Sequence, residues 1–144
     1  MTFDWSDYLQ LAKQLSGSGD EAARRSAVSR AYYSAFHAAS LSLTSNKVTT
    51  DPKYSRDRHL RVWNIYIVSS NKTCRSIGNK GQRLKLERQD ADYDATSGFP
   101  DLRIQRCISQ AQDLLSRISV NVPEGFSPSG SGLRSAISYL RRLF

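Results

Sequence analysis

The longest helical pattern in the chain is EAARRSAVSRAYYSAFHAASLSL, residues 21–43. Its apolar side chains recur at helical spacings and fall within roughly 100° of one another on a helical wheel. They are Val28, Tyr32, Ala35, Phe36, Ala39 and Leu43. A neighbouring strip of small side chains, which lets another helix approach closely, consists of Ala27, Ala31 and Ala38. The stretch therefore predicts one long helix with a buried face.

A shorter helix is expected before this stretch. Residues 4–15 carry an apolar stripe at spacings typical of a helix, and Gly17-Ser18-Gly19 then breaks the pattern. Ser18 and Glu21 have the spacing of a capping box, in which a hydroxyl and a carboxylate satisfy the free amides at a helix start. We therefore expect the long helix to begin at this point.

Three more helical patterns follow the long helix. The polar residues 44–54 include Pro52 and predict a loop. The helical patterns after this loop cover about 55–70, 73–91 and 100–119. Pro100 suits the first position of the last of them, because the amide that proline lacks would have no partner there.

The pattern at 73–91 is the weakest of these. Gly78 and Gly81 disfavour a helix, whereas the Arg-Leu-Lys-Leu-Glu-Arg run at 83–88 is rich in helix formers. Arg83 and Glu87 have the i,i+4 spacing of an ion pair. We expect a helix here whose start is poorly defined.

These patterns predict one domain and an all-α fold. No strand pattern or internal repeat is present, so we expect an up-and-down helical bundle of four to five helices over residues 1–120. Residues 121–132 are rich in glycine, proline and serine and read as a linker. Residues 133–144 predict a basic, amphipathic C-terminal helix. This helix is expected to dock on the bundle or on a second copy, with a partner or a membrane surface as the alternative.

The chain is basic. Its 21 Lys and Arg against 13 Asp and Glu give a net charge of +8 and a pI near 9.8. Such a charge attracts polyanions, so RNA, other nucleic acid or a nucleotide is the expected class of partner. The N-terminus lacks a basic region followed by an apolar run, and no stretch approaches the ~20 apolar residues of a membrane span. We therefore expect a cytoplasmic protein that does not enter the membrane.

Metal chemistry has no support in the sequence. Cys74 and Cys107 are expected as free thiols of a reducing compartment. Together with His37 and His59 they match no spacing of zinc ligands. We predict neither a metal nor another cofactor.

A polar row lies on the long helix, away from its apolar stripe. Arg30 and His37 are two helical turns apart and share a face with Tyr33, roughly 150–170° from the stripe, so we expect the row to be exposed. Histidine exchanges protons near neutral pH, and a guanidinium can hold the charge that develops on phosphate during RNA cleavage. The alternative is that the row forms a helix contact in a dimer.

Two motifs together resemble a known family. Arg-Ser-Ala-Val-Ser-Arg-Ala-Tyr-Tyr-Ser-Ala-Phe-His at 25–37 is followed later in the chain by Arg-Gln-Asp-Ala-Asp-Tyr-Asp at 88–94. In this order within a helical chain they resemble the HEPN domain family, and in particular its small prokaryotic members with an Ala-Asp-Tyr motif. The resemblance covers roughly residues 4–120.

The resemblance implies a function and a partner. It implies a homodimer with a polar cleft along the dimer interface. Many HEPN proteins are metal-independent endoribonucleases that serve as toxins, often beside a nucleotidyltransferase-like antitoxin that in some pairs modifies a tyrosine of the motif. Others only bind nucleotides or partner proteins. We therefore expect a ribonuclease toxin, with a non-catalytic nucleotide- or partner-binding module as the alternative.

The resemblance also implies site residues. In ribonuclease members an arginine is followed a few residues later by a histidine, and in some a tyrosine comes close behind. Arg88 and Tyr93 match the arginine and tyrosine, whereas Asp90 and Asp92 stand where the histidine would be. The expected catalytic residues are Arg88, Tyr93, His37 and Arg30. The expected RNA- or nucleotide-binding residues are Tyr33, Arg83, Lys85 and Asp92.

Overall fold

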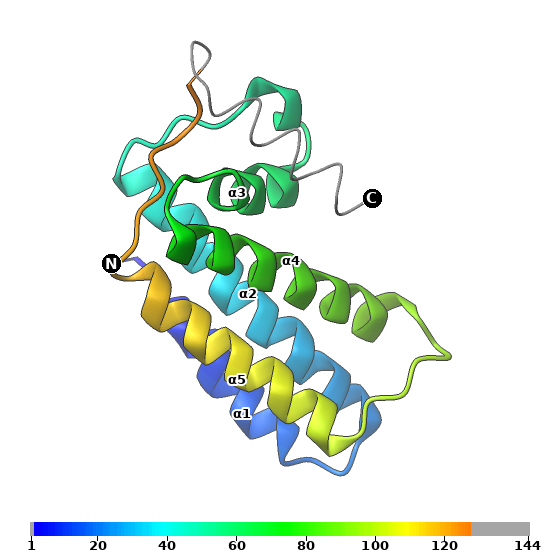
Figure 1. Ribbon diagram of the computed structural model, residues 1–144. Helices are drawn as coiled ribbons and strands as arrows, with labels where there is room; N and C mark the ends of the chain where they lie inside the picture. The colour runs from blue at the N-terminus through cyan, green and yellow to red at the C-terminus, as the bar shows by residue number, and fades with distance from the viewer. Residues whose placement is uncertain (1, 128–144) are drawn as a thin grey trace.

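The computed structural model describes residues 2–127, in which five α-helices and one short 3₁₀-helix form a bundle without strands (Figure 1). The elements are α1 (Ser6–Ser16), α2 (Glu21–Ser45), η1 (Pro52–Tyr54), α3 (Arg58–Ile67), α4 (Lys72–Tyr93) and α5 (Asp101–Ile118). The prediction of an all-α helical bundle is confirmed. The helix expected at 133–144 lies outside the described residues. None of the helices in 2–127 is long and apolar enough to cross a bilayer.

The centre of the bundle is α2. It packs against α1, α3, α4 and α5, and Figure 1 shows it running between and behind α4 and α5. The six apolar side chains predicted to form its core face are all buried, with Leu43 the most exposed of them at 4%. In the strip of small residues, Ala27 and Ala31 are buried and Ala38 is half-buried. The helical period thus identified the buried face of α2 correctly.

The start of α2 differs from the predicted capping box. The N-cap residue is Asp20, whose carboxylate accepts a hydrogen bond from the Ala22 amide at 3.1 Å. The Ser18 hydroxyl instead accepts from the amide of Asp20 itself, also at 3.1 Å. A carboxylate at the N-cap pairs a free amide as serine would and adds favourable charge at the positive end of the helix. The prediction of Ser18 as the cap is therefore wrong by two residues.

Two other helix starts also follow their caps rather than the apolar pattern. α3 begins at Arg58, after η1, because the Asp57 carboxylate accepts from the Leu60 amide at 3.0 Å. Pro100 has an extended backbone and is the N-cap of α5, so the helix begins one residue later than predicted, at Asp101. Both differences are local, and the helices themselves lie where the periodicity placed them.

The two glycines of α4 are packing residues. A Cβ atom on Gly81 would overlap the ring of Trp63 on α3, and one on Gly78 would overlap Ile67 and the carbonyl of Trp63. α4 is continuous from Lys72 to Tyr93 through both of them. The glycines that weakened the helix prediction are therefore what allows α3 and α4 to touch.

The ion pair predicted within α4 between Arg83 and Glu87 does not form. Glu87 pairs instead with Arg103 of α5, whose Nε lies 2.6 Å from its carboxylate. Arg103 also binds Asp90 at 3.0 Å. One arginine of α5 thus holds two carboxylates of α4, and this pairing between helices replaces the local one.

The start of the predicted linker returns to the bundle. The Glu124 carboxylate accepts a hydrogen bond from the Ser69 hydroxyl at 2.6 Å, between α3 and α4. The Phe126 amide donates to the carbonyl of Thr49 at 2.7 Å. Residues 121–127 are therefore held against the end of the bundle that carries η1.

Candidate functional site

Arg88 is the one charged residue of 2–127 that the fold buries, with 7% of it exposed. It lies near the C-terminal end of α4. Its guanidinium carbon is 5.4 Å from the ring centre of Tyr32, 5.5 Å from that of Tyr33 and 5.9 Å from that of Tyr93. A cation is favoured among aromatic rings, and three tyrosines from two helices surround this guanidinium.

The guanidinium of Arg88 is buried, but few polar groups of residues 2–127 pair with it. Its ion-pair partner Asp92 is 3.7 Å away, at the long end for such a contact, and no residue among those described accepts a hydrogen bond from Nε. Burial of a charge costs free energy unless hydrogen bonds and a close partner compensate. A buried polar group without a partner calls for an explanation, and a bound anion that pairs with the guanidinium is one.

Asp92 ties this arginine to α2. Its Oδ2 accepts a hydrogen bond from the Ser29 hydroxyl at 3.2 Å and is the oxygen that faces Arg88. Tyr93 follows at the last position of α4 and is 80% exposed. The site therefore includes the carboxylate of Asp92 beside Arg88 and the exposed ring of Tyr93.

The end of α4 is held in place by Arg25 of α2. Its guanidinium donates to the carbonyls of Ala91 at 3.1 Å and Asp94 at 2.8 Å, and also to that of Ser97. The last carbonyls of a helix have no partner within the helix, so an arginine that reaches them stabilises the helix end. Arg25 thus positions the turn that presents Asp92 and Tyr93.

A histidine from α3 completes the site. His59 Nδ1 lies 2.6 Å from the hydroxyl of Tyr32, and Trp63 Nε1 donates to the same hydroxyl at 3.0 Å. The His59 ring stacks on Phe36 with 4.3 Å between centroids. Burial lowers the pKa of His59, and the positive charge of Arg88 lowers it further. Tyr32 therefore contacts both Arg88 and His59.

Sequence reasoning missed His59 as a site residue. A signal was present, because His59 precedes the buried Val62, Trp63 and Tyr66 by three, four and seven residues and so lies on the buried stripe of α3. A histidine on such a stripe needs a polar partner, but the pattern does not say which. The partner is Tyr32, which the periodicity marked only as a core residue.

The row of Arg30, Tyr33 and His37 is half-buried rather than exposed. Residues at and before the start of α1 cover it: the Trp5 ring stacks on His37 with 3.7 Å between centroids. Arg30 lies 4.6 Å from the ring centre of Tyr8 and 5.4 Å from that of Tyr33. The expectation of a free polar face was wrong because it ignored the aromatic side chains that α1 brings to α2.

His37 and Arg88 share one neighbour, Tyr33, among their ring contacts. His37 contacts Trp5, Tyr33 and Phe36, and Tyr33 is the residue that it shares with Arg88. Burial lowers the pKa of His37, and the charges of Arg58 and Arg30 act in the same direction. Of the two histidines, His59 is the one whose charge state responds to Arg88.

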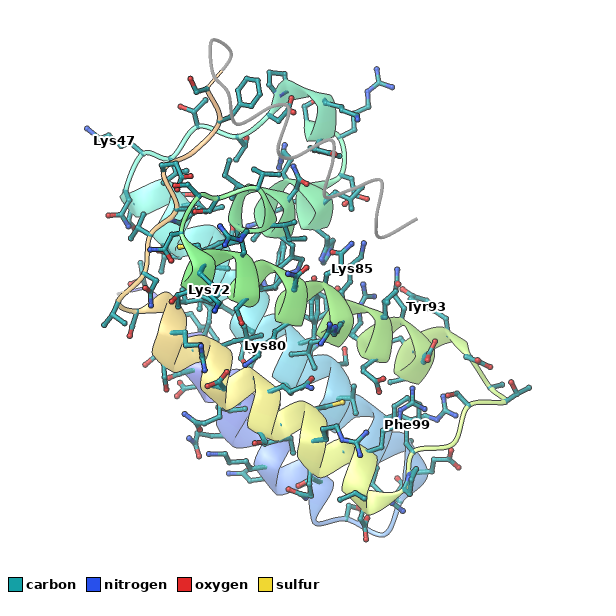
Figure 2. The ribbon with its side chains drawn as sticks, viewed as in Figure 1. Lys47, Lys72, Lys80, Lys85, Tyr93 and Phe99 are labelled. Carbon is teal, nitrogen blue, oxygen red and sulfur yellow. The ribbon has the colours of Figure 1, made fainter. Side chains whose placement is uncertain are left out.

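Two of the residues predicted to bind RNA or a nucleotide, Lys85 and Arg83, lie on different sides of α4. Lys85, one turn before Arg88, acts electrostatically on His59. Figure 2 shows Lys85 and Tyr93 on the edge of α4 that faces away from α5, whereas Lys80 extends toward α5. Arg83 is exposed and lies about 140° around the helix from Arg88. The structure thus gathers Arg88, Asp92, Tyr93, Tyr33 and Lys85 but separates Arg83 from them.

This arrangement has a positive charge suited to an anion such as phosphate. Arg88 and Arg30 both contact Tyr33, Lys85 lies one turn before Arg88, and the exposed Tyr93 offers a ring on which a base could stack. No group of three or more His, Cys, Asp or Glu side chains within 2–127 has the arrangement of a metal site. Comparison with known proteins adds nothing to this, since no family model, no curated protein and no solved structure matches the chain.

Proposed function

We propose that the protein is a HEPN-type toxin, a metal-independent endoribonuclease that acts as a homodimer. The observation that supports this most directly is Arg88, a buried cation among tyrosines of α2 and α4 whose one ion pair within residues 2–127 is long. The net charge of +8 favours association with RNA. The type of reaction is inferred from the resemblance of the motifs at 25–37 and 88–94 to HEPN ribonucleases.

The reaction proposed is a transesterification within RNA. The ribose 2′-oxygen forms a bond to the adjacent phosphorus while the bond from phosphorus to the 5′-oxygen breaks. A base accepts the proton of the 2′-hydroxyl, and the departing 5′-oxygen receives a proton, so the products are a cyclic phosphate and a 5′-hydroxyl. Arg88 stabilises the charge on the phosphorane, and His37 or Tyr93 assists the proton transfers.

The proposed dimer would form the cleft from both copies. We expect this cleft to be lined by the exposed Tyr93 and by the half-buried Arg30 and Tyr33, which contact each other. A nucleotidyltransferase-like antitoxin is the partner proposed to restrain the enzyme. Light scattering after size exclusion tests the dimer directly, and a monomer at all concentrations would contradict it.

The first test of the activity is a gel assay of the purified full chain with mixed RNA in EDTA. We expect cleavage by the wild-type chain and loss of at least about 10²-fold in Arg88→Ala, since removal of one stabilising donor costs this much in related chemistry. Tyr93→Phe and His37→Ala are assayed beside it. Arg106→Ala is the matched control, because it removes an equal charge from an exposed position on α5. Intact RNA throughout would contradict the ribonuclease proposal.

The second candidate is a binding module without catalysis. Asp90 and Asp92 stand where a histidine would follow Arg88, and Asp92 already pairs with the arginine. Neither aspartate is neutral near pH 7 as a histidine can be, so the motif lacks its usual group for proton transfer, and this feature favours binding of a nucleotide or a partner protein over cleavage. Calorimetric titration with nucleotides, together with a pull-down, tests it. Heat of binding without cleavage would favour this candidate.

A further inference from the structure

His59 of α3 contacts α2 beside the Arg88 site. Its ring packs on Phe36 of α2, and its Nδ1 faces the hydroxyl of Tyr32 at 2.6 Å. Arg88 and Lys85 act on it from α4. Within residues 2–127 the contact with Tyr32 is the one hydrogen bond of this ring. The other ring nitrogen, Nε2, thus retains its capacity for a ligand.

The direction of the hydrogen bond between Tyr32 and His59 follows from the surroundings of the hydroxyl. Tyr32 is fully buried, and its oxygen already accepts from Trp63 Nε1 at 3.0 Å. A buried hydroxyl needs an acceptor for its own proton, and that acceptor is His59 Nδ1. Tyr32 therefore donates to Nδ1, and the proton of the neutral imidazole lies on Nε2.

A charged His59 would disrupt this network. Both nitrogens of an imidazolium donate, so His59 Nδ1 and Trp63 Nε1 would both point N–H groups at Tyr32, whose own proton would lose its acceptor. The hydrogen bonds thus favour the neutral ring at every pH at which the tyrosine is protonated.

The charges around His59 act mostly in the same direction. The charged and titratable groups that act on it are Arg88 and Lys85 from α4, Arg58 and the N-cap Asp57 at the start of α3, and His37 from α2. Burial lowers its pKa most, and the cations add to this effect while Asp57 opposes it. A neutral imidazole with its proton on Nε2 donates one hydrogen bond and brings no charge.

We propose that His59 is a phosphate-binding residue of the Arg88 site, where its neutral ring donates a hydrogen bond from Nε2 to a phosphate oxygen of the bound RNA. The ligand in this proposal rests on the proposed function. Arg88 supplies the charge and His59 a hydrogen bond of fixed direction. The histidine that the chain lacks between Arg88 and Tyr93 is in this way replaced from α3, but as a donor and not as a base.

The tautomer is tested without any assay of activity. Two-bond proton–nitrogen spectra of the ¹⁵N-labelled full chain distinguish Nδ1–H from Nε2–H. We expect the Nε2–H form of His59 in the wild-type protein at pH 7 and a mixture of tautomers in Tyr32→Phe, which removes the donor to Nδ1. A wild-type ring protonated on Nδ1 would overturn the proposal, whatever the variants do.

The ligand contact is tested with a 2′-O-methyl RNA oligonucleotide, whose blocked hydroxyl prevents cleavage. We expect His59→Ala to weaken its binding at least about tenfold, because a hydrogen bond to a charged group is lost. His59→Gln should bind within about threefold of wild type, since an amide can accept from Tyr32 and donate to phosphate as the imidazole does. Arg106→Ala serves again as the control. Equal binding by His59→Ala and the wild-type chain would refute the proposal.

Unmodified RNA of the same sequence separates this proposal from the proposed function. Binding that depends on His59, with the unmodified RNA left intact, would remove the ribonuclease and support His59 as a phosphate ligand. Cleavage that requires Arg88 but is unchanged in His59→Ala would support the ribonuclease and overturn the role of His59. Thermal melting of each variant shows whether it is folded, and the tautomer measurement does not depend on any variant.

Discussion

Arg25 and Arg88 show how differently two arginines can be used in one small bundle. Arg25 is surrounded by carbonyls at the end of α4 and donates to Ala91, Asp94 and Ser97. Arg88 is more deeply buried and yet has a long ion pair, and its Nε has no partner among residues 2–127. The first arginine is a structural residue, whereas the second has a donor that the described part of the fold does not use.

This difference predicts opposite effects on stability. Replacement of a buried, poorly paired ion by an apolar side chain of similar length is often neutral or stabilising, so Arg88→Met should leave the free energy of unfolding unchanged or raise it by up to about 2 kcal/mol. Arg25→Met should lower it by at least about 2 kcal/mol, because several charged hydrogen bonds are lost. Urea denaturation followed by circular dichroism measures both. Equal losses in the two variants would make Arg88 structural.

Only some residues of the candidate site could be predicted from the sequence. Arg88, Asp92 and Tyr93 lie within two turns of one helix, so their proximity follows from the sequence alone. His59 and Tyr32 are far apart in the chain and meet only because α3 packs on α2. No local pattern carries that information, and His37 was therefore the histidine that sequence reasoning selected.

At the scale of the element, the contact between α3 and α4 depends on glycine. Gly81→Ala should destabilise the protein by about 1–3 kcal/mol, because the new methyl group overlaps Trp63 and forces one helix away. This loss should outweigh the gain of roughly 1 kcal/mol that alanine brings to a helix interior. Thermal unfolding of the variant measures the net effect.

Gly19→Ala is the control for this prediction, because nothing lies within 4 Å of a Cβ at that position. It should change stability little. A Gly81→Ala protein that is as stable as the wild-type chain would mean that α3 and α4 adjust their separation freely. The spectra of Trp63 would then be expected to shift without a loss of stability.

The helices as elements were predictable, and their ends and partners were less so. The apolar period identified all five helices of the described residues, since one face of each packs on its neighbours. Asp20 and Asp57 then decided where α2 and α3 begin. Glu87 was assigned to Arg83 on the same helix, but Arg103 of α5 comes closer once the helices pack. Spacing within one helix predicts pairs on that helix, but it cannot show that a residue of another helix lies closer.

At the scale of the whole molecule, the bundle puts its unusual residues on one side of α2. α1 brings aromatic rings to His37 and Arg30, α3 brings His59, and α4 brings Arg88. α5 packs against α1, α2 and α4. Both histidines of the chain therefore lie near cations in half-buried positions, where the fold disfavours their charged form.

The free energy of unfolding should fall as the pH falls below about 6.5, the ordinary pKa of histidine. Burial lowers the folded-state pKa of both His37 and His59, with nearby arginines adding to the effect. The unfolded chain therefore takes up protons before the folded protein does, so acid favours unfolding. Above about 6.5 both states carry neutral histidines, and this dependence disappears.

Urea unfolding midpoints at pH 7.5, 6.5 and 5.5 test this for the wild-type chain and for the double variant His37→Gln/His59→Gln. The wild-type midpoint should fall between the last two pH values, and that of the variant should fall less. The carboxylates with lowered pKa values, such as Asp57 and Asp113, lose their contribution only in more acidic solution and do not interfere. Parallel curves for the two proteins would show that the histidines are as easily protonated in the bundle as in the unfolded chain, which would also remove the basis for a neutral His59 at the Arg88 site.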